Sequence, residues 1–401
     1  MDSDDRAVLA QLDEEYLLWL LRRLVQIPSI NPPGRLAPVA GFVAEEMRAQ
    51  GLEVQVAGDA GNGWERPNVL ALLPGESAGW GVLFSAHTDV VPVYDRAAWH
   101  HDPFEPAVID GVVFGRGTAD CKGSLAAMMV ALRALSRARR PLPHSLALLA
   151  WAGDEWHPPD ARWFNGETYM ATNGYLRPSL YIGGEPYDLT ICCASRGRLW
   201  VHVEVGGESA HAASGAGVNA ILGAVGIITA VCNLPRETHP VLGRDTINVG
   251  TIRGGVQTNT VPDRCELVFD IRFAAPRTVA QVAALTQEAV TMEAGRRGVV
   301  VRRVSFPERR EPIEFPAEGR LVRILQEAGR SALGRELPRG GAVSFGDIAD
   351  WKDRVGIEEA CLFGPGKTAQ AHAVDEHVAL ADVIAAARVY ALAGLRGARL
   401  P

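Results

Sequence analysis

The sequence predicts an α/β protein that carries a second, smaller α+β unit as an insertion. From residue 13 to 155, short apolar segments bounded by Gly and Pro alternate with segments of helical periodicity, which is typical of a mixed, mostly parallel sheet flanked by helices. Near residue 196 the pattern changes to strict apolar/polar alternation, and after residue 308 long helices return. We therefore expect a main unit at 1–195 and 309–401 and an inserted unit at 196–308.

The elements of the main unit follow from periodicity and from the residues that end them. A helix over 13–26 has apolar residues at helical spacing and ends before a proline-rich segment, and a helix over 36–51 has Gly51 as its stop. Short apolar runs bounded by Gly and Pro indicate buried strands. We expect strands at 68–75, 81–93 and 144–155 and further helices at 122–138, 318–334 and 382–397.

The inserted unit combines alternating strands with one apolar helix. The segments 197–207, 246–255 and 265–273 alternate apolar and polar residues, and 217–234 has helical periodicity. A strand with this alternation has one face in the core and the other in water. We therefore expect one half-solvated sheet in this unit.

Composition and charge exclude several classes of protein. The 401 residues are 47% hydrophobic and 22% charged with a formal net charge of −7, which is typical of a soluble globular protein and unfavourable for binding a polyanion. The first 15 residues lack the apolar core of a signal peptide, and no run of ~18 uncharged apolar residues indicates a membrane span. We expect a cytoplasmic protein with no nucleic-acid or membrane partner. The six scattered cysteines predict reduced, mostly buried thiols.

Candidate metal ligands follow apolar strands or lie in Gly-rich loops, where a rigid sheet can present side chains to a ligand. Imidazole and carboxylate groups without thiolates suit zinc, manganese or cobalt in an open hydrolytic site. Asp89 lies two residues after His87, and we expect its carboxylate to accept the second N–H of that imidazole. The candidates are His87, Asp89, Asp120, Asp154, Glu155, His157, Glu185, His372, Asp375, Glu376 and His377.

Ordered motifs across the chain carry a family resemblance. They are HTDVVP, W--DPFEPAVIDGVVFGRGTADCKG, DE, GGEP, GESAH, GVNAI, GGVQTNTVPD, DIR and GPG-----H--DE. The sequence resembles the co-catalytic metallopeptidase and amidohydrolase family that includes acetylornithine deacetylase, succinyl-diaminopimelate desuccinylase, aminoacylase and glutamate carboxypeptidase, from about residue 14 to 395. The resemblance implies a zinc-peptidase-like domain with a mixed sheet flanked by helices. It also implies an inserted two-layer α+β lid domain that commonly dimerises.

The same resemblance assigns roles to the residues that match the motifs. His87, Asp120 and Glu185 would hold one metal ion, and Asp120 would bridge to a second ion whose other ligand is His372. Glu155 matches the general base that takes a proton from the attacking water. The implied cofactor is a divalent metal, zinc, manganese or cobalt, with one or two ions per chain.

The inserted unit supplies further candidates by resemblance. His211 and Asn259 match residues that often reach the partner subunit's active site as oxyanion donors. Arg272 matches a residue that grips a substrate carboxylate, a role that the forked guanidinium suits. In the main unit, Glu376 would anchor the loop that carries His372. The implied assembly is a homodimer formed through the inserted domain.

The residue after Glu155 departs from the family pattern. Most relatives carry a second acidic residue there as a metal ligand, whereas this chain has Trp156, whose indole has no lone pair for a cation. Three interpretations follow: the second metal site is lost and His372 becomes a hydrogen-bond donor to the substrate; the adjacent His157 replaces the ligand; or the chain is non-catalytic. Trp156 also begins an aromatic segment at 156–178, and we expect part of it to wall the substrate pocket.

The function implied is hydrolysis of a C–N bond, the amide of a small N-acyl amino acid or dipeptide-like molecule. Glu155 would activate water and pass the proton to the leaving amine, while His211 and the metal stabilise the oxyanion. One alternative is an aromatic amine aminohydrolase of the nitroanthranilate type. Another is a non-catalytic binding relative. In each case the expected partner is a small molecule.

Overall fold

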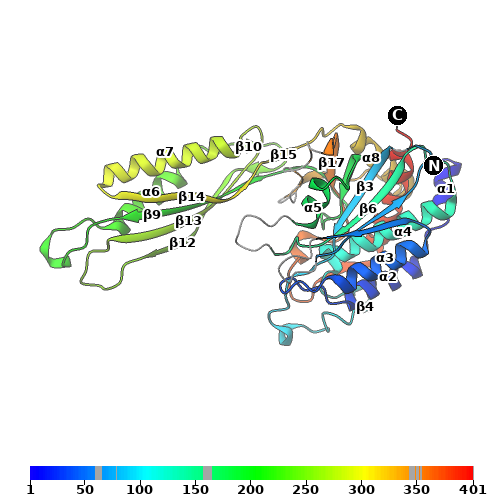
Figure 1. The fold of residues 1–401 in the computed structure, drawn as a ribbon, viewed down its shortest axis with the longest axis horizontal. Coiled ribbons are helices and arrows are strands. Elements are labelled where there is room, and N and C mark those ends of the chain that lie inside the picture. The colour runs from blue at the N-terminus through cyan, green and yellow to red at the C-terminus, as the bar shows by residue number, and fades with distance from the viewer. Residues whose placement is uncertain are drawn as a thin grey trace. The chain divides into compact units, whose positions relative to one another are not determined.

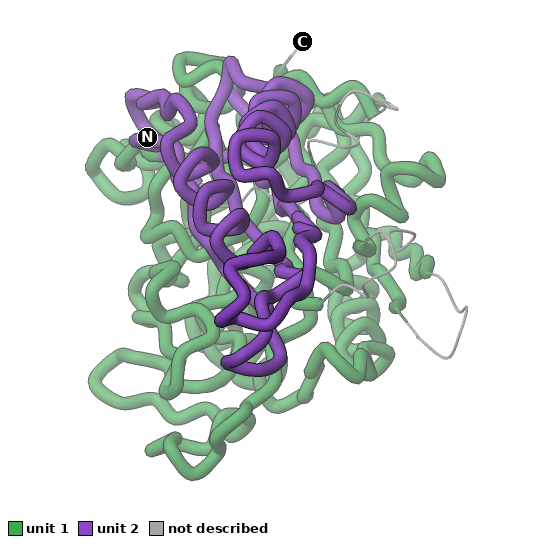
Figure 2. Tube along the Cα trace, turned by 90° about the vertical axis from the view of Figure 1, so that its left-hand side faces the viewer, with its two compact units in different colours: residues 1–193, 315–340, 346–401 green, residues 194–314, 341–345 purple. Residues whose placement is uncertain are grey.

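The computed structural model describes residues 1–58, 66–77, 79–156, 165–342, 348, 352 and 355–400. The chain divides into two compact units (Figure 2): one comprises Met1–Cys193, Phe315–Gly340 and Gly346–Pro401, and the other comprises Ala194–Glu314 and Gly341–Phe345. The predicted mixed α/β fold class is confirmed. In the part of the chain that the structure describes, no helix is long and apolar enough to cross a bilayer.

The larger sheet is mixed, with parallel strands at its centre. Its order over the described residues is β1-β2-β6-β3-β7-β17-β8-β15, and β16 also pairs with β8. The strands β6, β3, β7 and β17 run parallel, whereas β1 and β2 are antiparallel to their neighbours. The bounds are β1 (Glu53–Ala57), β2 (Asn68–Leu73), β3 (Trp80–His87), β6 (Ser145–Trp151), β7 (Pro178–Gly183), β8 (Ile191–Ser195), β15 (Ile313–Glu314), β16 (Arg339–Ala342) and β17 (Glu359–Leu362).

The central strands are buried on both faces, which explains their apolar sequences. All residues of β6 are buried, and β3 is buried from its second residue to its last. Because these strands are parallel, the carboxyl ends of β3, β6 and β7 lie at one edge of the sheet, the edge at which α/β proteins bind ligands.

Helices pack against this sheet and against one another (Figure 1). The helix α4 is buried from Gly123 to Leu135 and contacts β3, β6 and α10. In α10, the Tyr390 ring lies edge-on to the rings of Phe84 and Phe363. Over the described residues, the α-helices of this unit are α1 (Ser3–Leu9), α2 (Glu14–Gln26), α3 (Ala37–Ala49), α4 (Gly123–Ala138), α5 (Gly166–Thr172), α8 (Arg320–Leu333) and α10 (Leu380–Gly397).

A small antiparallel sheet joins two loops that are far apart in the sequence. Its strands are β4 (Ala107–Ile109), β5 (Val112–Phe114) and β18 (His377–Ala379), and His377 pairs with Phe114. The pairing is extended by Gly115, whose N–H donates to the carbonyl oxygen of Glu376 at 2.8 Å. The loop before β18 is therefore held beside the loop after β5.

The second unit has two layers, with helices on one face of an antiparallel sheet (Figure 1). The sheet order is β12-β13-β9-β14. Alternate residues of β13 are buried, so that its apolar side chains share one core with the helices. The bounds are β9 (Gly197–Gly206), α6 (Ala220–Cys232), β12 (Thr246–Gly254), β13 (Arg264–Phe273), α7 (Val279–Arg297) and β14 (Val300–Arg310), with a short hairpin of β10 (Thr238–His239) and β11 (Gly243–Arg244).

Candidate active site

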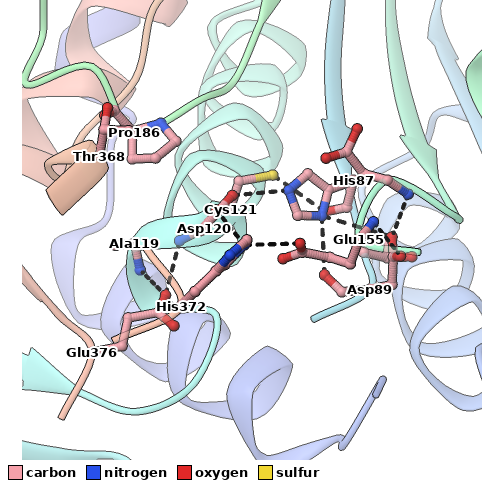
Figure 3. A network of polar contacts seen from close by, with 12 residues as sticks. His87, Asp89, Ala119, Asp120, Cys121, Glu155, Pro186, Thr368, His372 and Glu376 are labelled. Carbon is pink, nitrogen blue, oxygen red and sulfur yellow. Dashed lines mark hydrogen bonds and ion pairs between the residues drawn. The ribbon is translucent and has the colours of Figure 1, made fainter. Parts of the chain in front are cut away.

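The ends of the central strands and the adjoining loops carry the candidate residues of the first unit. His87 is the last residue of β3, Glu155 lies in the loop after β6, and Glu185 lies just after β7. Asp120 lies immediately before α4, and His372 lies in the loop that precedes β18. Figure 3 shows the side chains of His87, Asp120, Glu155 and His372 close together.

A first group of potential metal donors surrounds the His87 ring. One donor atom each from His87, Asp120, Cys121 and Glu185 lies within 4.8 Å of the others. The Nδ1 atom of His87 lies 3.0 Å from the carbonyl oxygen of Asp89, which can only accept, so Nδ1 carries the proton. The other nitrogen, Nε2, lies 3.0 Å from Asp120 Oδ1, so it carries a proton here that an ion bound between the two atoms would replace. Ligands of a tetrahedral zinc ion lie roughly 3.4 Å apart, so this pair fits a shared ion.

A second group overlaps the first at Asp120. Donor atoms of Asp120, Glu155 and His372 lie within 4.8 Å of one another. His372 Nε2 lies 2.9 Å from Glu155 Oε2 and 3.5 Å from Asp120 Oδ2. Glu155 Oε1 is buried and has no hydrogen-bond partner among the described residues. Glu155 therefore has one oxygen that is free to interact with a ligand or to take a proton.

Burial and hydrogen bonds shift the pKa values of the residues in the second group. Burial raises the pKa of the Glu155 carboxyl to about 7, although the hydrogen bond from His372 opposes this shift. Hydrogen bonds to Asp120 and Glu155 raise the pKa of His372 to about 10. Burial opposes ionisation of Asp120, but hydrogen bonds from His372 and His87 outweigh it and hold the pKa of that carboxyl below its usual value. Protonated imidazoles thus compensate the carboxylates here, a function that a divalent cation performs in metal sites.

The predicted hydrogen bond between the Asp89 carboxylate and His87 is wrong. The ring is held by the Asp89 carbonyl oxygen, and Asp89 Oδ1 lies 3.7 Å from Nδ1. The carboxylate is turned toward the loop after β6, where it accepts from the N–H groups of Gly153 at 3.0 Å, Asp154 at 3.3 Å and Glu155 at 3.1 Å. Both Oδ atoms therefore fix the loop that carries Glu155.

A buried ion pair supports Asp120 and His372. Glu376 Oε1 accepts from the N–H groups of Ala119 and Asp120, each at 3.0 Å. Glu376 Oε2 lies 2.6 Å from Arg116 NH1, and Arg116 NH2 donates to the His372 carbonyl oxygen at 3.4 Å. The position of Glu376 agrees with its expected role as an anchor, and it connects both donor loops.

Comparison with known proteins shows the family to which the chain belongs. The sequence profile of peptidase family M20/M25/M40 matches residues 83–395. The acetylornithine deacetylase of Proteus mirabilis is 32% identical over 330 residues, which cover 79% of each chain. The chain belongs to the peptidase M20/M25/M40 family. It is accordingly an enzyme, a hydrolase that acts on C–N bonds, and the resemblance noted in the sequence is confirmed.

Solved structures of an aminopeptidase and a dipeptidase share the fold. The aminopeptidase PepT from Bacillus cereus has a TM-score of 0.77 at 20% identity, over 97% of this chain and 100% of that chain. Human carnosine dipeptidase 1 has a TM-score of 0.73 at 18% identity over the whole of both chains. At these identities the likeness concerns the fold alone.

In this M20/M25/M40 chain, His211 and Asn259 lie in neighbouring exposed loops of the second unit. The N–H of Ala212 donates to the Asn259 carbonyl oxygen at 2.9 Å. His211 Nδ1 accepts from the N–H of Ala213 at 3.2 Å, so the proton of a neutral ring lies on Nε2. The side chain of His211 thus presents a donor at its outer edge.

Arg272 lies in β13 of the second unit and already has a carboxylate partner. Its Nε and NH2 atoms donate to the two carboxylate oxygens of Asp270 at 2.7 and 2.9 Å. The Arg272 side chain is 28% exposed. A substrate carboxylate would therefore have to exchange with Asp270 or share the guanidinium with it.

The aromatic segment after Glu155 is described only in part. Trp156 is half-buried, whereas His157, the alternative metal ligand, lies outside the described residues together with the chain to 164. Further along, the rings of Tyr169 and Tyr175 stack with centroids 6.3 Å apart. These two rings pack on each other.

Sequence reasoning did not identify Glu167, a buried carboxylic acid in α5. Its Oε1 accepts from Ser85 Oγ at 2.5 Å and from the Tyr181 hydroxyl at 2.7 Å. Burial raises the pKa of Glu167 from its ordinary 4.5 to about 7. Because the folded pKa is raised, protonation stabilises the fold most below the unfolded value of 4.5, and this contribution is lost as the pH rises through 7.

The variant Glu167→Gln replaces this acid with a neutral side chain at every pH. We expect the free energy of unfolding of the variant minus that of the wild type to be about 2 to 3 kcal/mol larger at pH 8 than at pH 5. Urea unfolding of both proteins at several pH values measures the difference. A difference that is independent of pH would show that Glu167 is ionised in the folded protein.

Proposed function

We propose that this enzyme is a metal-dependent amidohydrolase that cleaves small N-acyl amino acids or dipeptide-like molecules. The observation that carries the proposal is the position of Glu155. Its backbone N–H donates to Asp89, its carboxylate belongs to the donor group that shares Asp120, and one carboxylate oxygen has no protein partner among the described residues. A general base must lie within reach of a water while it is free to accept a proton.

The residues of the first donor group fit a divalent ion. His87, Asp120 and Glu185 would hold it, and the ion would supply a Lewis acid that polarises the amide carbonyl. Glu155 takes a proton from the attacking water and delivers it to the nitrogen of the leaving amine. Asp89 keeps Glu155 in place through the amides of its loop.

We propose that one ion per chain supports activity. Trp156 stands where a second acidic ligand is expected, so the only carboxylates in the second donor group of the described residues are those of Asp120 and Glu155. A second ion would therefore have to bind to Glu155, the base. A cation bound there would occupy the lone pairs of the base. In the one-ion enzyme, His372 would exchange its contact with Glu155 for a hydrogen bond to the substrate. The half-buried Trp156 would line the pocket at this point.

We propose that the second unit acts as a lid and dimerisation domain. Its edge strand β12 is mostly exposed along its length, and Leu222 and Val225 of α6 are 62% and 49% exposed, as expected for surfaces that pair in a homodimer. His211 and Asn259 would donate to the oxyanion, and Arg272 would bind the substrate carboxylate. Sedimentation equilibrium of the purified chain tests the dimer.

Release of free amine from a substrate panel tests the proposed activity. The panel contains N-acetyl amino acids, unmodified dipeptides and 2-aminobenzoates, each offered to protein loaded with Zn²⁺, Mn²⁺ or Co²⁺. We expect turnover of N-acyl amino acids or dipeptides that stops after chelation and returns when metal is added back. Ammonia release from the aminobenzoates alone would assign the enzyme to aromatic amine hydrolysis instead.

A further inference from the structure

Cys121 belongs to the first donor group but has no role in the proposed function. Cys121 follows Asp120 directly, is fully buried, and contributes its Sγ atom to the group that includes His87 and Glu185. Figure 3 shows the sulfur beside the His87 ring. The predicted ligand set contained no thiolate, because a buried Cys is usually a small apolar residue.

The surroundings of Cys121 differ from those of a core cysteine. Its thiol donates to the carbonyl oxygen of His87 at 3.4 Å, and its Sγ lies within 4.8 Å of donor atoms from an imidazole and two carboxylates. Cys361 in β17 is also fully buried, yet over the described residues it belongs to no donor group. Burial alone therefore does not place a cysteine sulfur among metal-binding atoms in this chain.

We propose that Cys121 is a thiolate ligand of the ion held by His87, Asp120 and Glu185, and that it makes this site selective for zinc over manganese. This inference rests on the proposed function. Thiolates favour softer ions such as Zn²⁺, whereas an imidazole with carboxylates also accepts Mn²⁺. Ligation breaks the S–H bond, forms a metal–sulfur bond and releases the proton to solvent.

A fourth protein ligand remains compatible with hydrolysis. Catalytic zinc sites usually have three protein ligands, and zinc accepts a fifth ligand during catalysis, so four protein ligands still leave a position for substrate. Removal of the sulfur should consequently alter metal preference more than it alters the ability to bind an ion.

Cobalt binding reports directly on sulfur ligation, because Co²⁺ bound to a thiolate absorbs strongly in the near ultraviolet, whereas imidazole and carboxylate ligands do not produce this band. Co²⁺ is titrated into chelator-treated wild type, Cys121→Ser and the matched control Cys361→Ser. We expect the band in the wild type and in Cys361→Ser. In Cys121→Ser we expect bound Co²⁺ without the band, and a loss of Zn²⁺ affinity of roughly tenfold or more with Mn²⁺ affinity changed much less.

The outcomes separate this inference from the proposed function. Wild type that binds Co²⁺ without the band, or Cys121→Ser that retains it, overturns sulfur ligation and leaves the metal-dependent hydrolase intact. Folded wild type that binds neither Co²⁺ nor Zn²⁺ overturns both. Circular dichroism of each variant establishes that it is folded before metal is added.

Discussion

Replacement of Glu155 with Gln is expected to lower kcat by about 10²–10⁴-fold, the contribution of a general base, while the bound ion is retained. The amide has nearly the same shape as the carboxylate but cannot take a proton from water. The backbone N–H of Glu155 donates to the Asp89 carboxylate at 3.1 Å, and a change of the Glu155 side chain leaves this hydrogen bond in place. The measurement is kcat on the best substrate of the panel, with metal content determined on the same sample.

Glu167→Gln is the matched control for this prediction. It makes the same chemical change in another buried glutamate whose pKa is raised to about 7, but its contacts are Ser85 and Tyr181 rather than a donor group. We expect its kcat to remain within about twofold of the wild type, since it touches no reacting atom. If the two variants lost activity equally, Glu155 would not be the base.

The second large effect is expected from Asp89→Asn. An amide nitrogen cannot accept hydrogen bonds, so in either orientation of the Asn side chain at least one N–H of the loop after β6 would lose its acceptor. In one orientation the Asn31 amide, which donates to Asp89 at 2.8 Å, would lose its acceptor too. We expect kcat to fall by roughly 10–100-fold because Glu155 is displaced, together with a loss of about 1–3 kcal/mol in stability.

The metal affinity of Asp89→Asn distinguishes two roles of the Asp89 carboxylate. In one it holds the loop that carries Glu155, and in the other it orients the His87 ring. Because the His87 ring is held by the Asp89 backbone carbonyl at 3.0 Å, the Asn variant should bind Zn²⁺ within a few-fold of the wild type. A large loss of Zn²⁺ affinity with unchanged kcat for the loaded enzyme would instead mean that the carboxylate orients the imidazole.

Sequence patterns located most of the candidate site because its residues follow strands that are easily recognised. His87, Glu155 and Glu185 come directly after buried apolar runs, and parallel strands bring their ends to one edge whatever the side-chain details. The detailed contacts of Asp89 could not be predicted, because they depend on the path of the loop after β6.

The signals that were missed differ in kind. Helix α7 was not predicted, although apolar residues repeat at helical spacing along it and Thr278 and Gln281 form a capping box at its start. Cys121 directly follows the predicted ligand Asp120, and this position in the sequence could have marked it as a candidate. Glu167 had no signal, because its burial arises from packing between α5 and the strands that carry Ser85 and Tyr181.

Titration of Zn²⁺ into chelator-treated protein, with amine release and bound metal measured together, shows whether one ion held beside Glu155 drives hydrolysis. We expect activity to rise with the first equivalent, to be complete near one ion per chain, and to fall when excess Zn²⁺ reaches Glu155 through the second donor group. Full activity without metal, or activity that appears only with the second ion, would contradict this expectation.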